Sequence, residues 1–263
     1  MESDFEKIER VLGKYLFVKF CFEKYITWVF SKKSVNRRDF DLIDILLQTA
    51  DGLERMQQLE DRLTHAKQIL NLSEDEFRNK FGFTDDLLTS DKEKIHDILA
   101  EPLFVLDLHN NDFKNIEKLP ANLKKNDKKI KLADFKAEYN SEWFAIELKT
   151  IRTESWAKNG ALLCNTPNPY ERKTMVYNNC LTKIEDKKRR VFEQLDNTCK
   201  FFNCTKKMIA FYTRRLGPSS LMDTSDYVDV AQNIIKTYPQ IHYLGFKNYF
   251  ADVIIFYPNL GTT

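Results

Sequence analysis

The sequence predicts an α/β protein, in which a mixed β-sheet is flanked by helices and follows an all-helical region. Residues 128–151 alternate apolar and polar side chains on both sides of Asn140-Ser141, which is typical of a β-hairpin. The apolar runs Met208–Tyr212 and Asp252–Tyr257 are typical of short buried strands, with a helix near Val228–Lys236 packed on them. Strands alternating with helices indicate one α/β sheet core.

Residues 1–85 form the predicted helical region. Asp39–Leu70 carries a long amphipathic pattern of leucines and methionine, which fits either a packed helical subdomain or a dimerisation helix in a homodimer. Ser73 and Glu76 match a capping box, which predicts that a new helix begins there. The chain is therefore expected to divide into a helical region, 1–85, and an α/β domain, 86–263.

The hairpin fixes which side chains face each other. If Asn140-Ser141 is the loop, Tyr139 faces Glu142, and counting outward places Asp134 opposite Glu147. Side chains alternate, so Lys149 shares the face of Glu147. The opposite face is expected to carry only apolar side chains, from Ala133, Phe135, Ala137, Tyr139, Phe144, Ile146 and Leu148. One face of the hairpin is thus predicted to be core and the other charged.

The charged face predicts a metal site. Two carboxylates opposite each other in a sheet repel, and a divalent cation between Asp134 and Glu147 removes that repulsion. Carboxylate oxygens are ligands that Mg²⁺ or Mn²⁺ prefers, and Lys149 lies beside them, where it can orient a metal-bound water. The alternative is a solvent-exposed hairpin face on which the three residues form ordinary cross-strand ion pairs.

An acid on one strand followed by Glu147-Leu148-Lys149 on the next resembles the signature of the PD-(D/E)xK nuclease superfamily. Ala133 stands where that signature has proline. The resemblance implies a restriction-endonuclease-like fold and a metal-dependent endonuclease that hydrolyses phosphodiester bonds, with DNA favoured over RNA. It implies Mg²⁺ (or Mn²⁺) held by Asp134, Glu147 and the Leu148 carbonyl. The alternatives to a DNA endonuclease are an RNA endonuclease with the same site and an inactive binding or assembly module with the nuclease fold.

The resemblance also suggests further site residues on two helices. A helix beginning at Ser90 is expected to reach Glu101, which matches a further acid of the superfamily, with Asp97 in reserve. A second helix, expected over Leu181–Leu195, would bring Lys187 or Gln194 to the site. Thr153–Asn179, between hairpin and helix, fits neither strand nor helix and is predicted to be a long functional loop.

The positive charge is clustered on both sides of this hairpin signature. The net charge is only +2, but lysines at 124, 125, 128, 129 and 131 precede the site, and basic residues at 183 and 187–190 follow it. Helical spacing would place Lys183, Lys187 and Arg190 on one side of the second helix. These three residues are therefore the candidates for contacts with nucleic-acid phosphates.

The remaining composition bounds the class of protein. Five cysteines without a Cys-x-x-Cys pair argue against structural zinc, and their odd number without a signal peptide predicts reduced thiols in a cytoplasmic protein. The most hydrophobic stretch, Tyr15–Phe30, contains Lys19, Glu23 and Lys24. It is too short and too charged to span a bilayer, so no membrane association is expected.

Overall fold

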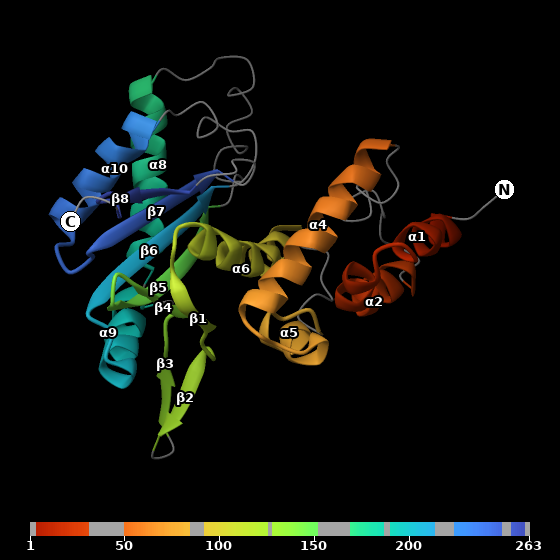
Figure 1. The fold of residues 1–263 in the computed structure, drawn as a ribbon. Coiled ribbons are helices and arrows are strands. Elements are labelled where there is room, and N and C mark those ends of the chain that lie inside the picture. Colours follow the sequence, from red (N-terminus) through yellow and green to blue (C-terminus); the bar gives the residue numbers. More distant parts are fainter. Residues whose placement is uncertain are drawn as a thin grey trace. The chain divides into compact units, whose positions relative to one another are not determined.

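The structure is a computed structural model that describes residues 4–31, 50–84, 92–125, 128–151, 169–186, 190–213, 224–248 and 254–260. The chain forms two compact units, Met1–Asn110 and Asn111–Thr263 (Figure 1). The division lies later than the predicted boundary at residue 85. The reason is that α6 (Lys92–Asn110) packs against α4 (Ala50–Ile69) and so belongs to the first unit.

The described part of the first unit is helical, as its sequence predicts. Besides α4 and α6 it contains α1 (Asp4–Leu12), α2 (Leu16–Ser31) and α5 (Glu74–Lys80). Ser73 and Glu76 form the predicted capping box at the start of α5. The Glu60 carboxylate accepts hydrogen bonds from the free backbone amides of Phe17 and Val18, at 3.0 and 2.7 Å, and so caps the N-terminus of α2.

Two details of this unit bear on the sequence predictions. Met56 and Leu63 on α4 are fully buried within the chain, which supports the packed-subdomain interpretation for that helix face. Helix α6 contains Glu101, as predicted, and continues through Pro102 to Asn110. Proline disfavours helical geometry at the preceding residue without forbidding it.

The second unit is built on a mixed six-stranded sheet, which confirms the α/β class. Its strand order is β1-β4-β5-β6-β7-β8, in which β5, β6 and β7 run parallel and the remaining neighbours pair antiparallel. The strands are β1 (Lys114–Lys118), β4 (Phe135–Tyr139), β5 (Glu142–Ile151), β6 (Lys206–Thr213), β7 (Tyr243–Asn248) and β8 (Ile255–Tyr257). Strand β5 therefore lies inside the sheet, between β4 and β6.

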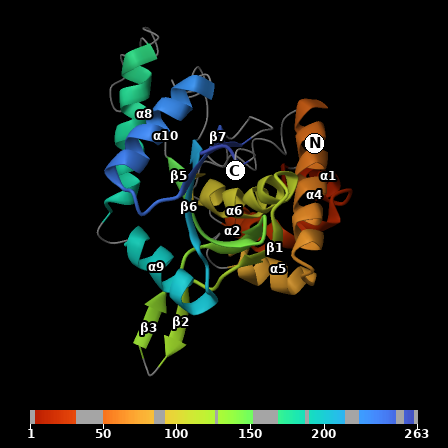
Figure 2. The ribbon, with the colours of Figure 1, turned by 60° about the vertical axis from the view of Figure 1, so that its left-hand side comes forward.

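Three helices pack on one face of this sheet: α8 (Pro169–Ile184), α9 (Val191–Phe202) and α10 (Thr224–Thr237). Helices α8 and α10 lie side by side in both views (Figures 1 and 2). Ala145 and Ile151 of β5 are buried in this apolar cluster, while Phe144 and Ile146 are buried on the other face. Both faces of β5 are therefore covered, so the predicted charged face is buried, and the alternative of a solvent-exposed hairpin face is wrong for β5.

The register of the hairpin agrees with the prediction. Tyr139 faces Glu142 and Phe135 faces Ile146. Asn140 and Ser141 both have positive φ, 49° and 62°, as a two-residue hairpin turn of the favoured type requires. Residues 128–131 do not extend β4, however. They form β3 (Lys128–Lys131), which pairs with β2 (Asn122–Lys125) in a separate two-stranded sheet.

The helix expected over Leu181–Leu195 is interrupted. Helix α8 ends at Ile184, and α9 begins at Val191 after Arg190, whose φ of 50° is left-handed. Lys183 and Arg190 thus lie on different elements and cannot form one side of a helix, while Lys187 lies outside the described residues. The predicted loop Thr153–Asn179 was wrong for its later part, since α8 begins at Pro169, while residues 153–168 lie outside the described residues.

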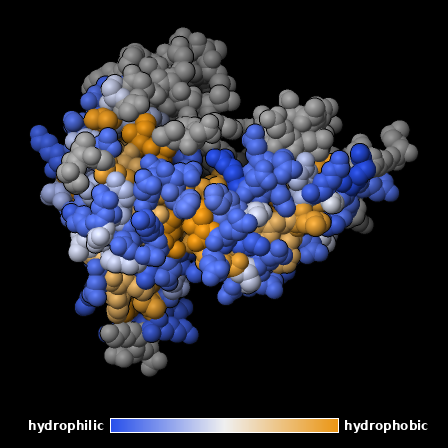
Figure 3. Space-filling view, in the orientation of Figure 1, coloured by the Kyte–Doolittle hydropathy of each residue, from blue (hydrophilic) through white to orange (hydrophobic). Residues whose placement is uncertain are grey.

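Hydrophilic side chains cover much of the face shown in Figure 3, with apolar patches between them. Among the described residues, no helix is both long and apolar enough to cross a membrane. The four cysteines at described positions, Cys21, Cys180, Cys199 and Cys204, are free thiols.

Candidate active site

Asp134 lies in a bend immediately before β4, where its carboxylate bridges two other strands. Its Oδ2 accepts a hydrogen bond from the backbone amide of Leu148 on β5 at 2.9 Å. Its Oδ1 lies 3.5 Å from Nζ of Lys118 on β1. The Asp134 side chain keeps 24% of its surface exposed, so it is the accessible acid of the site.

Glu147 and Lys149 lie on β5, two residues apart on the same side of the strand. Their side chains are 1% and 5% exposed, and Lys149 Nζ donates a hydrogen bond to Glu147 Oε1. Phe135 pairs with Ile146 at the end of the β4–β5 ladder, so Asp134 and Glu147 are the residues directly beyond that pair, and the Asp134 charge acts on the Glu147 carboxyl. The burial contradicts the alternative of an ordinary surface ion pair, since solvent does not reach this carboxylate.

The surroundings of Glu147 set its protonation. Burial raises the pKa of the Glu147 carboxyl well above its usual range, because water no longer solvates the ionised form, and the nearby charge of Asp134 raises it further. Lys149 and Lys118 act in the opposite direction. The second oxygen, Oε2, is buried and accepts no hydrogen bond in the part of the chain that the structure describes.

Helix α9 holds the segment that leads into Asp134. Gln194 donates a hydrogen bond from Nε2 to the Leu132 carbonyl at 3.0 Å, and Asn197 donates to the Lys131 carbonyl at 3.1 Å. Thr198 Oγ1 accepts from the Ala133 amide at 2.8 Å and donates to the Gln194 carbonyl. Gln194 was predicted to reach the site. It contacts the backbone two residues before Asp134, and its Oε1 is buried without a hydrogen-bond partner among the described residues.

Lys118 was missed in the sequence. It ends β1, pairs with Phe135 in the sheet, and is 7% exposed, with Nζ 4.9 Å from the centre of the Phe135 ring. The surrounding sequence, Lys114–Lys118, alternates weakly and is rich in charge, so it lacks the pattern of a core strand. The sequence did contain one indication of a strand here: Pro120 follows Leu119, and proline near a strand is typical of a strand at the edge of a sheet.

The other predicted site residues lie on other elements. Glu101 and Asp97 lie on α6, in the first unit, so the contacts within the second unit do not test their predicted role. Lys183 lies in the last turn of α8, and Arg190 is bound to Glu193 at 3.0 Å, with most of its side chain exposed. The residues that do converge are Asp134, Glu147, Lys149 and Lys118, and Gln194 supports them from α9.

The cluster offers only two carboxylate ligands for a divalent cation. Among the described residues, no group of three or more His, Cys, Asp or Glu side chains is placed to hold a metal. Asp134 and Glu147 supply two carboxylates, and Mg²⁺ is commonly held by one or two carboxylates with several waters. The orphaned Oε2 of Glu147 is the observation in favour, because a buried carboxylate oxygen without a partner is costly.

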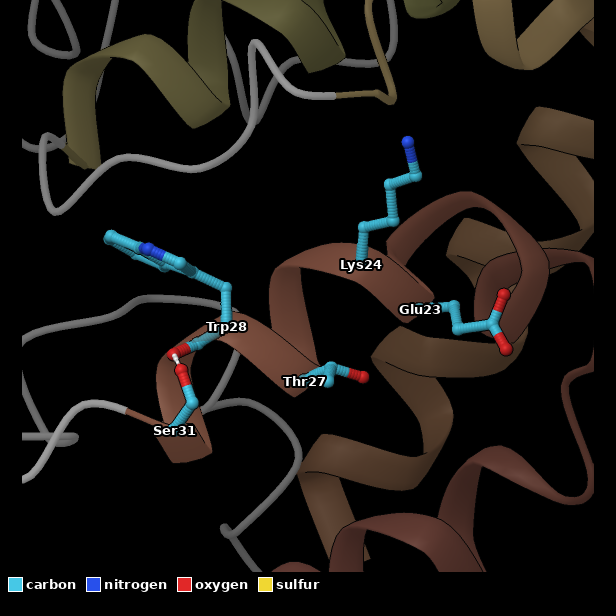
Figure 4. A pocket seen from close by; sticks show the side chains of 5 residues that line it. All are labelled: Glu23, Lys24, Thr27, Trp28 and Ser31. Atoms are coloured by element: carbon cyan, nitrogen blue, oxygen red, sulfur yellow. Dashed lines mark hydrogen bonds between the residues drawn. The ribbon is translucent and has the colours of Figure 1, made fainter.

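A second hollow, on helix α2, offers no comparable chemistry. It is lined by Glu23, Lys24, Thr27, Trp28 and Ser31 (Figure 4). All five come from one helix of the first unit, and the hydrogen bond drawn, from Ser31 Oγ to the Trp28 carbonyl, is local. The hollow brings together no set of acids or nucleophiles.

No family model matches the chain, and no curated protein or solved structure matches it either. A function must therefore be inferred from the residues of the cluster and their contacts.

Thr198→Val should lower the free energy of unfolding by about 1–3 kcal/mol, because it leaves the buried Ala133 amide without an acceptor. Urea unfolding in chelator measures this. Thr182→Val is the matched control, since the exposed Thr182 hydroxyl bonds only the Asn178 carbonyl of its own helix, and it should change stability by less than about 0.5 kcal/mol. Equal midpoints for the two variants would show that α9 does not hold the segment before Asp134.

Proposed function

We propose that the second unit is a metal-dependent endonuclease with a restriction-endonuclease-like core, which hydrolyses phosphodiester bonds in DNA in preference to RNA. One observation carries the proposal: a nearly fully buried Glu147-Lys149 pair on an inner strand, with the partly exposed Asp134 held against the same strand by the Leu148 amide. A buried ion pair contributes little net stability, because desolvation offsets its attraction. Function therefore explains the pair better than folding does.

The residues divide the chemistry between them. Asp134, Glu147 and the Leu148 carbonyl would hold Mg²⁺ or Mn²⁺. When bound, such a metal lowers the pKa of a coordinated water and neutralises charge that builds on the phosphate. Lys149 Nζ, which donates to Glu147, would also donate to the attacking water and stabilise the hydroxide. Gln194 would act indirectly, because its hydrogen bond to the Leu132 carbonyl fixes the backbone before Asp134.

The four charged side chains balance each other before any ligand binds. Asp134 lies beside Lys118, and Glu147 is paired with Lys149, so two carboxylates face two ammonium groups when all four side chains are ionised. A divalent cation alone would leave the site with excess positive charge, which raises the free energy of a partly buried cluster. A phosphodiester brings a negative charge. Metal and substrate should therefore bind cooperatively at this site.

The alternative is a nuclease-fold binding module without activity. It is favoured by the absence, among the described residues, of a third acid or histidine beside Asp134 and Glu147. The two functions differ in one assay, which tests supercoiled plasmid, single-stranded DNA and RNA with Mg²⁺ or Mn²⁺. A nuclease cleaves at least one of them and chelator stops it, whereas a module cleaves none. Cleavage of RNA alone would select the RNA endonuclease.

Asp134→Ala, Glu147→Ala and Lys149→Ala should each lower metal-dependent cleavage by at least about 10²-fold, since each removes a ligand or the charge beside the water. Initial rates on the preferred substrate measure this. Glu142→Ala, on the same hairpin but 42% exposed, should retain activity. Full activity in Glu147→Ala would contradict the proposed site.

Glu147→Leu/Lys149→Met removes both members of the buried pair. In chelator this double variant should be as stable as the wild type or more stable, because burying apolar groups avoids the desolvation of two ions. Mg²⁺ should raise the melting temperature of the wild type, because a ligand that binds only the folded state stabilises that state. The variant lacks the Glu147 carboxylate, so Mg²⁺ should leave its melting temperature unchanged. If Mg²⁺ shifts both proteins equally, the metal binds elsewhere.

Lys118→Met should tighten Mn²⁺ binding without substrate by roughly tenfold, or about 1.4 kcal/mol, because it removes a positive charge beside Asp134. Titration calorimetry of the full chain measures it, with Asp134→Ala as the variant that should not bind the metal. An unchanged affinity would show that Lys118 does not balance the site.

A further inference from the structure

The hairpin β2–β3 is a separate basic element of the second unit. It projects away from the six-stranded sheet, with α9 beside its base, in both views (Figures 1 and 2). Alternation along the strands places Asn122, Lys124, Lys129 and Lys131 on one face, and Leu123, Ile130 and the exposed Lys128 on the other. We call the first of these the lysine face; Lys124 and Lys129 on it are exposed.

Charge is concentrated on this hairpin. Residues 122–131 contain five lysines and one aspartate, a net charge of +4, whereas the whole chain carries +2. The register sets Lys124 opposite Lys129 and Lys125 opposite Lys128. Like charges directly opposite each other destabilise a sheet, and a two-stranded hairpin is only marginally stable by itself. A bound polyanion would remove this repulsion.

The hairpin is fixed to the candidate active site. Lys131 is three residues before Asp134, a span of at most about 10 Å along the chain. The intervening backbone is held to α9 by the hydrogen bonds from Asn197 and Gln194 and by the one from Ala133 to Thr198. The base of the lysine face therefore lies close to Asp134.

We propose that the lysine face binds backbone phosphates of the nucleic-acid strand that the second unit cleaves, close to the scissile bond. This inference rests on the proposed nuclease function for the identity of the polyanion. Lysines contact phosphates as point charges and do not read bases, so the contact should be independent of sequence. It replaces the basic helix expected over Leu181–Leu195, which the structure interrupts.

The test is binding of the full-length Lys124→Gln/Lys129→Gln variant to fluorescent DNA and RNA oligonucleotides in chelator, where cleavage is absent. Affinity should fall by about tenfold at low salt, and the slope of log affinity against log salt should flatten by roughly 0.7 to 0.9 for each phosphate that the variant no longer neutralises. The variant should melt no lower than wild type, since the change removes like-charge repulsion. Weaker binding would then not reflect unfolding.

Lys114→Gln/Lys236→Gln is the matched control, because it removes the same charge from exposed positions on β1 and α10. It should bind like the wild type. An equal fall in affinity in both double variants, or an unchanged salt slope in the hairpin variant, would overturn the proposal. So would equally tight, lysine-dependent binding of polyglutamate or of phosphatidylserine vesicles, which would mark a surface for any anion.

The outcomes separate this inference from the proposed function. Hairpin-dependent binding without cleavage under any metal supports the lysine face and contradicts the nuclease. Metal-dependent cleavage that Glu147→Ala abolishes, with hairpin-independent binding, supports the nuclease and overturns the lysine face.

Discussion

The burial of Glu147 and Lys149 on strand β5 is the constraint on which the second unit depends. Strand β5 lies between β4 and β6 and is covered on both faces, so neither side chain reaches bulk water. Removing a carboxylate and an ammonium from water costs several kcal/mol for each ion. The surrounding strands and helices must compensate that cost with charges and hydrogen bonds at short range.

The elements near β5 supply this compensation. Strand β1 brings Lys118 beside Asp134, and the Leu148 amide fixes the Asp134 carboxylate against β5. Helix α9 donates side-chain hydrogen bonds to the backbone that enters Asp134. The same contacts position the basic hairpin, because β3 leads directly into this segment. The contacts of α9 therefore hold both the segment that carries Asp134 and the base of the basic hairpin.

Much of the hairpin could be predicted from the sequence because its information is local. Asn140-Ser141 sets the turn, and counting outward pairs Asp134 with Glu147 without knowledge of the rest of the chain. Burial of the charged face was not predictable, since period-two alternation does not reveal helices that pack on it from later in the sequence. Lys118 was missed because its short strand has no apolar pattern. The interruption of the predicted helix between Ile184 and Val191 was missed, because the charged residues in this part of the sequence keep the spacing expected for a helix.

The geometry allows a metal to bind without breaking the buried pair. Lys149 holds one oxygen of Glu147, while Oε2 accepts no hydrogen bond from the described residues. Asp134 is the partly exposed member, so access from solvent is on its side of the cluster. Under the proposed function, Asp134 and Glu147 would hold the cation, which would satisfy the orphaned oxygen, and Lys149 would act on a water. The burial that makes the pair costly for folding also removes competing solvent from the place where charge would develop, which strengthens each electrostatic contact to the phosphate.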